Sequence, residues 1–383
     1  MGSVDAGENE RVTHATSILK SAANCMKETG FINYFGMQRF GKFLDTHLVG
    51  IAVLKGNFEE ACEIIMRVKE NEHFKSVAAR ERWSKRFDGV DMQDEKAARE
   101  AEAKCARVVE RELGRFMNCE TSIVSSLSRT PRDYKKAFSS ISKHMRSMFL
   151  HAYQSYIWNK AASHRMACSD GEGGNSTDIG VGDLVLVENK GISNGGNGTS
   201  GLKGKVVKEV TQDDVETCKY SITDVVLPLV GSKIQYPSDS TGDLYDELLE
   251  EADLQKEDFG KIGDRELAVG GDYRKVICKP TDVDFEVKMY KDPHQPLVKT
   301  DLMNVHNASL ECVDITNEVK KDEAADGAEQ MLIGMVIGFT LPPSAYATIA
   351  LRELTRRPTS AQYQTELCLE GDCERNVGKP KPE

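Results

Sequence analysis

The first 165 residues carry apolar side chains mainly at helical spacing. In residues 12–28, Ile18, Leu19, Ala22 and Met26 share one stripe, and the pattern stops before Gly30, which predicts a helix that ends at the glycine. Further segments with a helical pattern or composition are 58–68, 93–113 and 132–164, the last as two successive helices. This part of the chain is therefore predicted to be mainly helical.

The pattern changes after Cys168. Two stretches rich in Gly, Asn and Ser, 169–177 and 189–201, predict loops. Short β-like runs occupy 183–187, 205–207, 222–230 and 284–290. An acidic, Ala-rich linker is expected at 316–327, and residues 331–340 read as a buried strand. Pro342 and Pro343 then stop the strand, and a helix with Ile349 and Leu354 on one face follows. The fold class expected is α+β.

Charge is distributed unevenly along the chain. The formal net charge is −11, yet residues 129–165 carry a net charge of +7 and residues 239–258 a net charge of −8. The basic side chains of the first segment are Arg129, Arg132, Lys135, Lys136, Lys143, Arg146, Lys160 and Arg165. They could form a surface that binds RNA phosphates, or they could be the solvated faces of ordinary helices.

Composition argues against several classes of protein. The ten cysteines are scattered without a Cys-x-x-Cys pair, which favours free thiols in a reducing compartment over a zinc site or a disulfide framework. The longest apolar run, 331–341, is shorter than the ~20 residues of a membrane span. No metal is expected, and the polar residues 1–10 are expected to form a disordered leader rather than a secretory signal.

Residues 30–41 have the most distinctive composition in the chain. Four aromatic residues, three glycines, Asn33, Gln38 and Arg39 stand together, a combination that suits a site for a planar ring. Residues 36–42 also match the first seven positions of a phosphate-binding G-x-x-x-x-G-K loop. Phe43 stands where that loop needs a Ser or Thr for Mg²⁺, which argues against nucleotide hydrolysis.

This segment resembles the NYFG…QRFG signature of the TruD-type pseudouridine synthases. Three further stretches resemble the same family in the same order, from about residue 12 to residue 357 and closest to its eukaryotic branch. They are Tyr153-Gln154-Ser155-Tyr156-Ile157-Trp158-Asn159, then Asp224 to Leu229 with Tyr236-Pro237, then Leu341 to Thr348 running into Leu351-Arg352-Glu353-Leu354.

The resemblance implies a fold and an activity. The activity is isomerisation of uridine to pseudouridine in tRNA and in other RNAs such as mRNA or small nuclear RNA, without a cofactor. The fold is a discontinuous pseudouridine-synthase-like catalytic core, here incomplete, with a large mixed α/β TRUD insertion domain. The family pattern divides the chain into a partial core at 11–57 and 326–360, an insertion at 58–325 (58–167 mainly helical, 168–325 mixed with loops), and a flexible tail at 361–383.

The resemblance also assigns substrate-binding residues. Phe35 matches the family's aromatic residue that stacks on the target base, and Asn33 matches the Asn that positions the catalytic Asp. Gln38 and Arg39 are expected to support this loop or to contact RNA. Core packing is the preferred interpretation for Tyr34 and Phe40, and for Tyr156, Ile157 and Trp158 on their helix; Gln154 and Asn159 are left open between core and contact.

One family feature has no counterpart in this chain. The catalytic Asp of the family stands upstream of the aromatic motif in a Gly-x-Lys-Asp segment, and none of the acids before Asn33 matches it. The chain is therefore expected to be inactive alone, as a fragment, a short isoform or a relative that has lost the chemistry; truncation is the favoured explanation. A missing core strand should leave apolar surface and an unpaired strand edge.

Two other classes of function remain open. The chain could be a non-catalytic RNA-binding protein that uses the basic 129–165 surface and Phe35, or a structural partner of another protein. RNA is the expected partner in the first case, and no membrane is expected in any. The expected location is intracellular, in the nucleus or cytoplasm, with an organelle left open.

Overall fold

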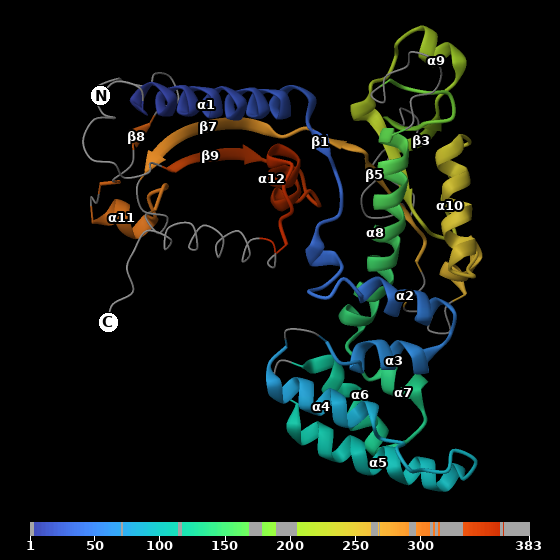
Figure 1. Ribbon diagram of the computed structural model, residues 1–383. Helices are drawn as coiled ribbons and strands as arrows, with labels where there is room; N and C mark the ends of the chain where they lie inside the picture. The colour runs from blue at the N-terminus through green and yellow to red at the C-terminus, as the bar shows by residue number, and fades with distance from the viewer. Residues whose placement is uncertain are drawn as a thin grey trace, which may run out of the picture. The chain divides into compact units, whose positions relative to one another are not determined.

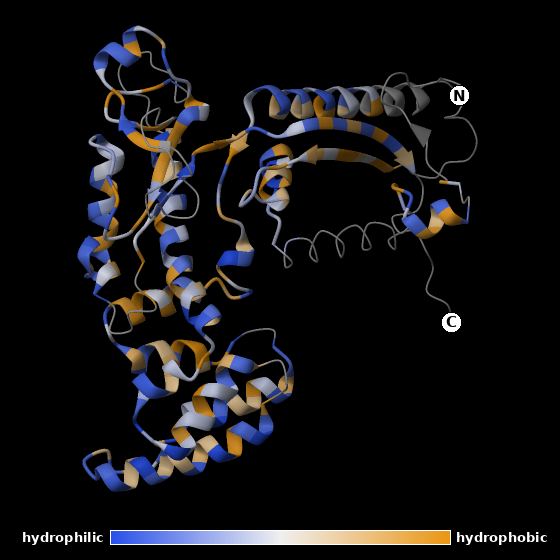
Figure 2. Cartoon of the chain, turned by 180° about the vertical axis from the view of Figure 1, so that it is seen from behind, coloured by the Kyte–Doolittle hydropathy of each residue, from blue (hydrophilic) through white to orange (hydrophobic). Residues whose placement is uncertain are grey.

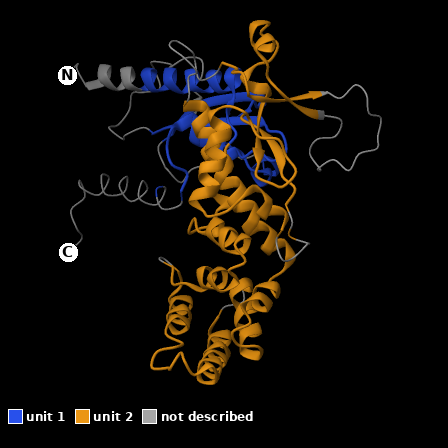
Figure 3. Ribbon diagram, turned by 90° about the vertical axis from the view of Figure 1, so that its right-hand side faces the viewer, with its two compact units in different colours: residues 1–33, 277–383 blue, residues 34–276 orange. Residues whose placement is uncertain are grey.

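The chain divides into two compact units (Figure 3). The structure is a computed structural model that describes residues 4–69, 72–113, 117–167, 178–188, 205–261, 267, 269–290, 296–306, 309–310, 313–314, 332–360 and 363. Unit 1 comprises residues 1–33 and 277–383, and unit 2 comprises residues 34–276. Unit 1 is therefore discontinuous in sequence, with unit 2 inserted between its two segments.

Unit 1 combines a long helix with an antiparallel sheet. Its elements are α1 (Val4–Thr29), β1 (Phe31–Ile32), β6 (Ile277–Cys278), β7 (Thr281–Tyr290), α11 (Asp301–Val305), β8 (Val313–Asp314), β9 (Leu332–Thr340) and α12 (Ala347–Thr355). The strand order of the sheet is β8-β7-β9, and β1 pairs separately with β6.

One face of this sheet packs against α1 (Figure 1). Val12 of α1 forms a buried cluster with Val287 and Met289 of β7, and Leu19 and Ile333 pack against it. Polar and apolar residues alternate along β7 (Figure 2), as a strand with one covered face requires. Among the described residues β9 pairs only with β7, so it is an edge strand of the described sheet.

The first half of unit 2 is helical. Its elements are η1 (Met37–Arg39), α2 (Thr46–Leu54), α3 (Phe58–Met66), α4 (Phe74–Ser84), α5 (Glu95–Glu112), α6 (Asn118–Arg129), α7 (Tyr134–Ser139) and α8 (Lys143–Ala167). Helices α2 and α8 pack closely, because Gly50 has no side chain: a Cβ there would lie 2.4 Å from the Phe149 carbonyl oxygen.

The second half of unit 2 contains a four-stranded antiparallel sheet. The strand order is β3-β2-β4-β5, with β2 (Leu184–Glu188), β3 (Lys205–Glu209), β4 (Val225–Leu229) and β5 (Asp272–Lys275), accompanied by α9 (Gln212–Glu216), η2 (Ile222–Asp224), α10 (Ser240–Glu251) and η3 (Lys256–Gly260). Helix α8 packs on β4, where the Trp158 indole N–H donates to the Leu227 carbonyl at 3.1 Å. The Tyr245 hydroxyl of α10 donates to the neighbouring Pro228 carbonyl at 2.7 Å.

Most of the elements predicted from periodicity are present. The helices predicted at 12–28, 58–68, 93–113 and 132–164 correspond to α1, α3, α5 and the pair α7 and α8. The four β-like runs correspond to β2, β3, β4 and β7, and β9 with α12 follows the predicted strand and helix at the C-terminal side. The mixture of helices and antiparallel strands confirms the α+β class.

Two local predictions were wrong. Residues 1–10 were predicted to be a disordered leader, but α1 begins at Val4. Acidic residues favour the first turns of a helix, and the sequence of this segment is rich in them, which explains the early start. The strand predicted as buried, β9, is only partly buried over Leu332–Phe339, because it lies at the edge of the described sheet.

Both the observed compact units and the predicted domains include one discontinuous part, but their boundaries differ. Contacts divide the chain after residues 33 and 276, whereas the family pattern placed the limits after 57 and 325. The division into catalytic core and insertion stays a prediction. The predicted loops at 169–177 and 189–201, the linker at 316–327 and, except for Tyr363, the tail at 361–383 lie outside the described residues.

Candidate functional site

The aromatic motif begins at the end of α1. Gly30 has φ +78°, and a Cβ there would lie 2.5 Å from the Cys278 carbonyl oxygen, so the turn between α1 and β1 requires glycine. The β1–β6 pair, Phe31 with Cys278 and Ile32 with Ile277, then fixes the strand that leads to Asn33. Asn33 is buried, with 8% of its surface exposed, and is the last residue of the first segment of unit 1.

Phe35 lies in a cluster of aromatic and cationic side chains within unit 2. Its ring meets Trp158 edge-on, with the ring centroids 5.6 Å apart and the planes at 90°. The guanidinium carbon of Arg274, on β5, lies 4.1 Å from the Phe35 centroid and 5.3 Å from Trp158. That of Arg39 lies 5.4 Å from the Phe35 centroid. Two cations thus approach one ring, an arrangement that the quadrupole of the ring favours.

The Phe35 ring, which by the family resemblance stacks on the target base, is covered in this structure. Only 6% of Phe35 is exposed, because Trp158 and the guanidinium of Arg274 pack against its ring. Arg274 is itself buried and donates to the Tyr34 carbonyl at 3.4 Å. Sequence reasoning missed Arg274, which lies far from the motif along the chain. Stacking of a nucleobase on Phe35 stays a prediction and requires the guanidinium to move aside.

Helix α8 holds the backbone of the motif. The Phe35 N–H donates to Oδ1 of Asn159 at 2.8 Å, and Nδ2 of Asn159 donates to the Phe35 carbonyl at 3.1 Å. One turn further on, Oγ of Ser163 and the Tyr34 hydroxyl are 2.9 Å apart. Asn159, which the sequence left open between core and contact, therefore bonds to the candidate stacking residue directly.

The other motif residues differ in their exposure and contacts. Gln38, in η1, is exposed, whereas Arg39 is partly buried, and its Nε has no hydrogen-bond partner among the described residues. The structure thus brings Arg39 to Phe35 and leaves Gln38 on the surface. Phe40 meets His47 edge-on at 6.2 Å.

A second aromatic stack joins α2 to α8. The rings of His47 and Tyr156 are 4.6 Å apart and nearly parallel, at 10°. Burial lowers the pKa of His47, and the charge of Asp45 opposes that shift. This stacked pair is a packing element of the two helices. Ile157 and Trp158 are fully buried, which confirms the core interpretation for these two residues.

The predicted RNA-binding residues do not all lie on the surface. Arg129, Lys135, Lys136 and Lys143 are exposed and belong to the ends and faces of α6, α7 and α8. Arg132 is partly buried and pairs with Glu59 at 3.7 Å. Four of the predicted side chains are therefore exposed to solvent.

Arg146, by contrast, is the buried member of this group. Only 8% of it is exposed, and its Nε donates to the Ile141 carbonyl at 3.0 Å, near the start of α8. Arg165, in the same basic segment, is also buried, paired with Asp183 at 2.7 Å. Net charge along a sequence gives no direction for each side chain, so it cannot separate surface cations from cations that bond internal carbonyls and carboxylates.

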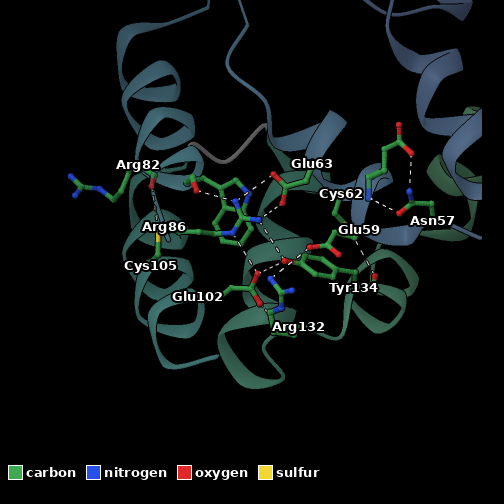
Figure 4. A network of polar contacts seen from close by, with 12 residues as sticks. Asn57, Glu59, Cys62, Glu63, Arg82, Arg86, Glu102, Cys105, Arg132 and Tyr134 are labelled. Atoms are coloured by element: carbon green, nitrogen blue, oxygen red, sulfur yellow. Dashed lines mark hydrogen bonds and ion pairs between the residues drawn. The ribbon is translucent and has the colours of Figure 1, made fainter. Parts of the chain in front are cut away.

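A buried polar network stabilises the helices of unit 2 rather than forming a reactive centre (Figure 4). Glu102 of α5 accepts hydrogen bonds from the Tyr134 hydroxyl and the Arg132 N–H and pairs with Arg86 at 3.5 Å. The nearby Cys62 is fully buried, and its burial, with Glu63 and other acids adding to the effect, raises the pKa of its thiol. This thiol therefore stays protonated, which excludes it as a nucleophile.

Neither a metal centre nor a membrane span is present among the described residues. They contain no group of three or more His, Cys, Asp or Glu side chains that could hold a metal ion. None of the helices described is both long and apolar enough to cross a bilayer.

Comparison with known proteins places the chain in a family. Residues 4–354 match the family described as tRNA pseudouridine synthase D (TruD). The chain is 35% identical over 366 residues to multisubstrate pseudouridine synthase 7 of Schizosaccharomyces pombe, covering 90% of this chain and 47% of that protein. It is 32% identical over 363 residues to human pseudouridylate synthase 7 homolog, covering 93% of this chain and 46% of that protein.

The fold is also similar to a solved structure. The crystal structure described as putative TruD from Methanosarcina mazei matches with a TM-score of 0.59 at 21% identity, covering 90% of this chain and 65% of that one. The chain spans about half the length of the fission yeast and human relatives. On the match that extends over nearly all of its residues, the chain belongs to the TruD family of pseudouridine synthases.

Proposed function

We propose that this chain provides the base-holding part of an RNA pseudouridine synthase, which converts uridine to pseudouridine in tRNA or in other RNAs. The family match over residues 4–354 carries the proposal, because it includes the motif around Phe35 and the α8 segment that bonds to it. The alternation of aromatic rings and cations at Phe35, Trp158, Arg39 and Arg274 supports it, since such groups hold bases and phosphates.

The chemistry defines what this site has to do. The bond between N1 of uracil and C1′ of ribose breaks, the base turns, and C5 forms the new bond to C1′; C5 loses a proton and N1 gains one. No electrons are gained or lost, so the isomerisation needs no redox partner. The enzyme must hold the detached base between the two steps, and a ring such as Phe35 can do so by stacking. Asn33 is proposed to orient the catalytic carboxylate.

We also expect the 383 residues to show no turnover alone. None of the acids preceding Asn33 matches the family's Gly-x-Lys-Asp segment. The measurement is release of tritium from tRNA labelled at C5 of uridine, since each turnover frees that hydrogen. Release at the rate of the fission yeast relative would overturn the expectation of inactivity.

A chimera tests whether this chain supports catalysis once a relative supplies the segment with the catalytic Asp. The 383 residues would replace the matching region of the fission yeast relative, and tritium release would be measured with and without Phe35→Ala. We expect the chimera to be active and the substitution to lower the rate by at least ~10²-fold, because the loose base loses its support. Equal rates in two folded chimeras, with folding checked by circular dichroism, would contradict the proposal.

The exposed lysines of α7 and α8 favour a second candidate function, RNA binding without catalysis. Lys135, Lys136 and Lys143 are all exposed to solvent. Replacing the three with Gln should weaken tRNA binding, because fewer phosphates are neutralised. It should also reduce the slope of log affinity against log salt by about 0.7–0.9 for each phosphate that no longer has a lysine beside it.

A control for this prediction lies on α5. Lys96 and Lys104 are also exposed, and replacing them with Gln should leave the slope unchanged. Equal losses in the two sets of variants would show that binding follows net charge rather than the α7 and α8 surface.

A further inference from the structure

Asn159 makes an unusually complete contact with the candidate stacking residue. Its side-chain amide uses one acceptor and one donor, and both partners belong to the backbone of Phe35. The two residues are far apart in sequence, so this contact ties the motif loop to the long helix α8. The adjacent residue of that helix, Trp158, supplies the ring that meets Phe35 edge-on.

The chemistry of this contact selects for asparagine. An N–H needs an acceptor and a carbonyl needs a donor, and a side chain must present both at the right separation. Aspartate lacks the donor when ionised and would place a negative charge beside the Phe35 carbonyl. Alanine offers neither group, and a partly buried N–H and carbonyl would lose their partners.

We infer that Asn159 is a positioning residue: it fixes the backbone of Phe35 and thereby holds the ring against Trp158, in the place where a detached uracil is to stack. This inference rests on the proposed function of Phe35. Asn159 acts through Phe35 and does not itself touch the reacting atoms. Its loss should lower catalysis through misplacement of the ring, an effect that reaches ~10²-fold for displacements of about 1 Å.

The first test reads the position of the ring rather than activity. The chain has two tryptophans, so Trp83→Phe leaves Trp158 as the only indole reporter. Trp158 is fully buried in the wild type. In this background, Asn159→Ala should make Trp158 fluorescence more sensitive to quenching by acrylamide, because Phe35 no longer covers it. Ser163→Ala, on the same helix and facing the Tyr34 hydroxyl, should change the quenching little.

Asn159→Asp provides an isosteric variant whose hydrogen-bond donor depends on pH. Its carboxyl is a donor when protonated and has lost the donor when ionised; partial burial raises the pKa of this group, and the bond from the Phe35 N–H lowers it. In a pH titration we therefore expect quenching close to that of wild type at low pH, where the carboxyl is protonated, and close to that of Asn159→Ala near pH ~8. A merely space-filling role of Asn159 would give the same quenching at both pH values.

The second test uses the active chimera described above. Asn159→Ala should lower the rate of tritium release by roughly 10- to 100-fold with little change in KM for tRNA. If Phe35→Ala lowers the rate and Asn159→Ala does not, the inference about Asn159 is wrong and the proposed function stands. If neither variant lowers the rate, the proposed function itself fails.

A variant that fails to fold also has a defined meaning. Should Asn159→Ala unfold the protein, Asn159→Asp decides, because its folded form can be compared with itself at two pH values. If Trp158 fluorescence in Asn159→Asp were as insensitive to acrylamide as in the wild type at both pH values, the inference would be overturned. Recovery of both quenching and tritium release as the pH falls, measured against the pH profile of the wild-type chimera, would support it.

Discussion

Replacing Glu102 with alanine should destabilise unit 2 by about 3–5 kcal/mol, one of the two largest losses expected from a single change in this chain. Glu102 is fully buried, shares the charge of Arg86 with Glu63, and also accepts from Tyr134 and Arg132 (Figure 4). Its removal leaves the guanidinium of Arg86 and two donors without this partner in a region that excludes water. Urea unfolding followed by circular dichroism would measure the change in the free energy of unfolding.

The same helix provides a matched control. Glu95 of α5 pairs with Arg99 at 2.8 Å, but both side chains are more than half exposed. Glu95→Gln should therefore change the free energy of unfolding by at most about 0.5 kcal/mol. Glu102→Gln, which keeps the shape but turns an amide donor toward other donors, should cost several times more. A similar small loss for both glutamine variants would show that burial adds nothing to the Glu102 contacts.

The helices that periodicity predicts are those with one apolar stripe and a clear end. Helix α1 ends at Thr29, just before Gly30, and α3 begins after Asn57, whose side chain accepts from the Glu60 N–H. Helix α2 was not predicted, because Thr46–Leu54 is apolar on nearly every face and gives no helical stripe. Helix α2 is buried by its contacts with α3 and α8, and these contacts exist only in the tertiary structure.

The candidate site was predictable in part from its motif. Composition marked the motif as a site for a planar ring, the family resemblance assigned Phe35 and Arg39 to it, and the structure places these two side chains together. Arg274 could not be found in this way, because β5 reaches the motif only through the order of the strands in the sheet. For the same reason the sequence did not indicate that a guanidinium would cover the Phe35 ring.

Trp158 is the residue on which the second large effect is expected. It is fully buried, donates to the Leu227 carbonyl of β4 at 3.1 Å, and packs against Phe35 and Arg274. Trp158→Ala should lower the free energy of unfolding by about 3–5 kcal/mol, the usual cost of emptying a large aromatic site. It should also release Phe35, so the active chimera should lose activity under conditions in which it remains folded.

Comparing the two tryptophans distinguishes how much the indole hydrogen bond and the volume of the ring each contribute to the free energy of unfolding. Trp83 is also buried, but its indole nitrogen has no hydrogen-bond partner among the described residues, so Trp83→Phe removes volume without removing such a bond. Trp158→Phe removes similar volume and also takes the donor from the Leu227 carbonyl, and it should therefore cost about 1–3 kcal/mol more in urea unfolding. Equal costs for the two phenylalanine variants would mean that the bond to β4 adds no net stability. Trp158 would then hold α8 and the motif loop by packing alone.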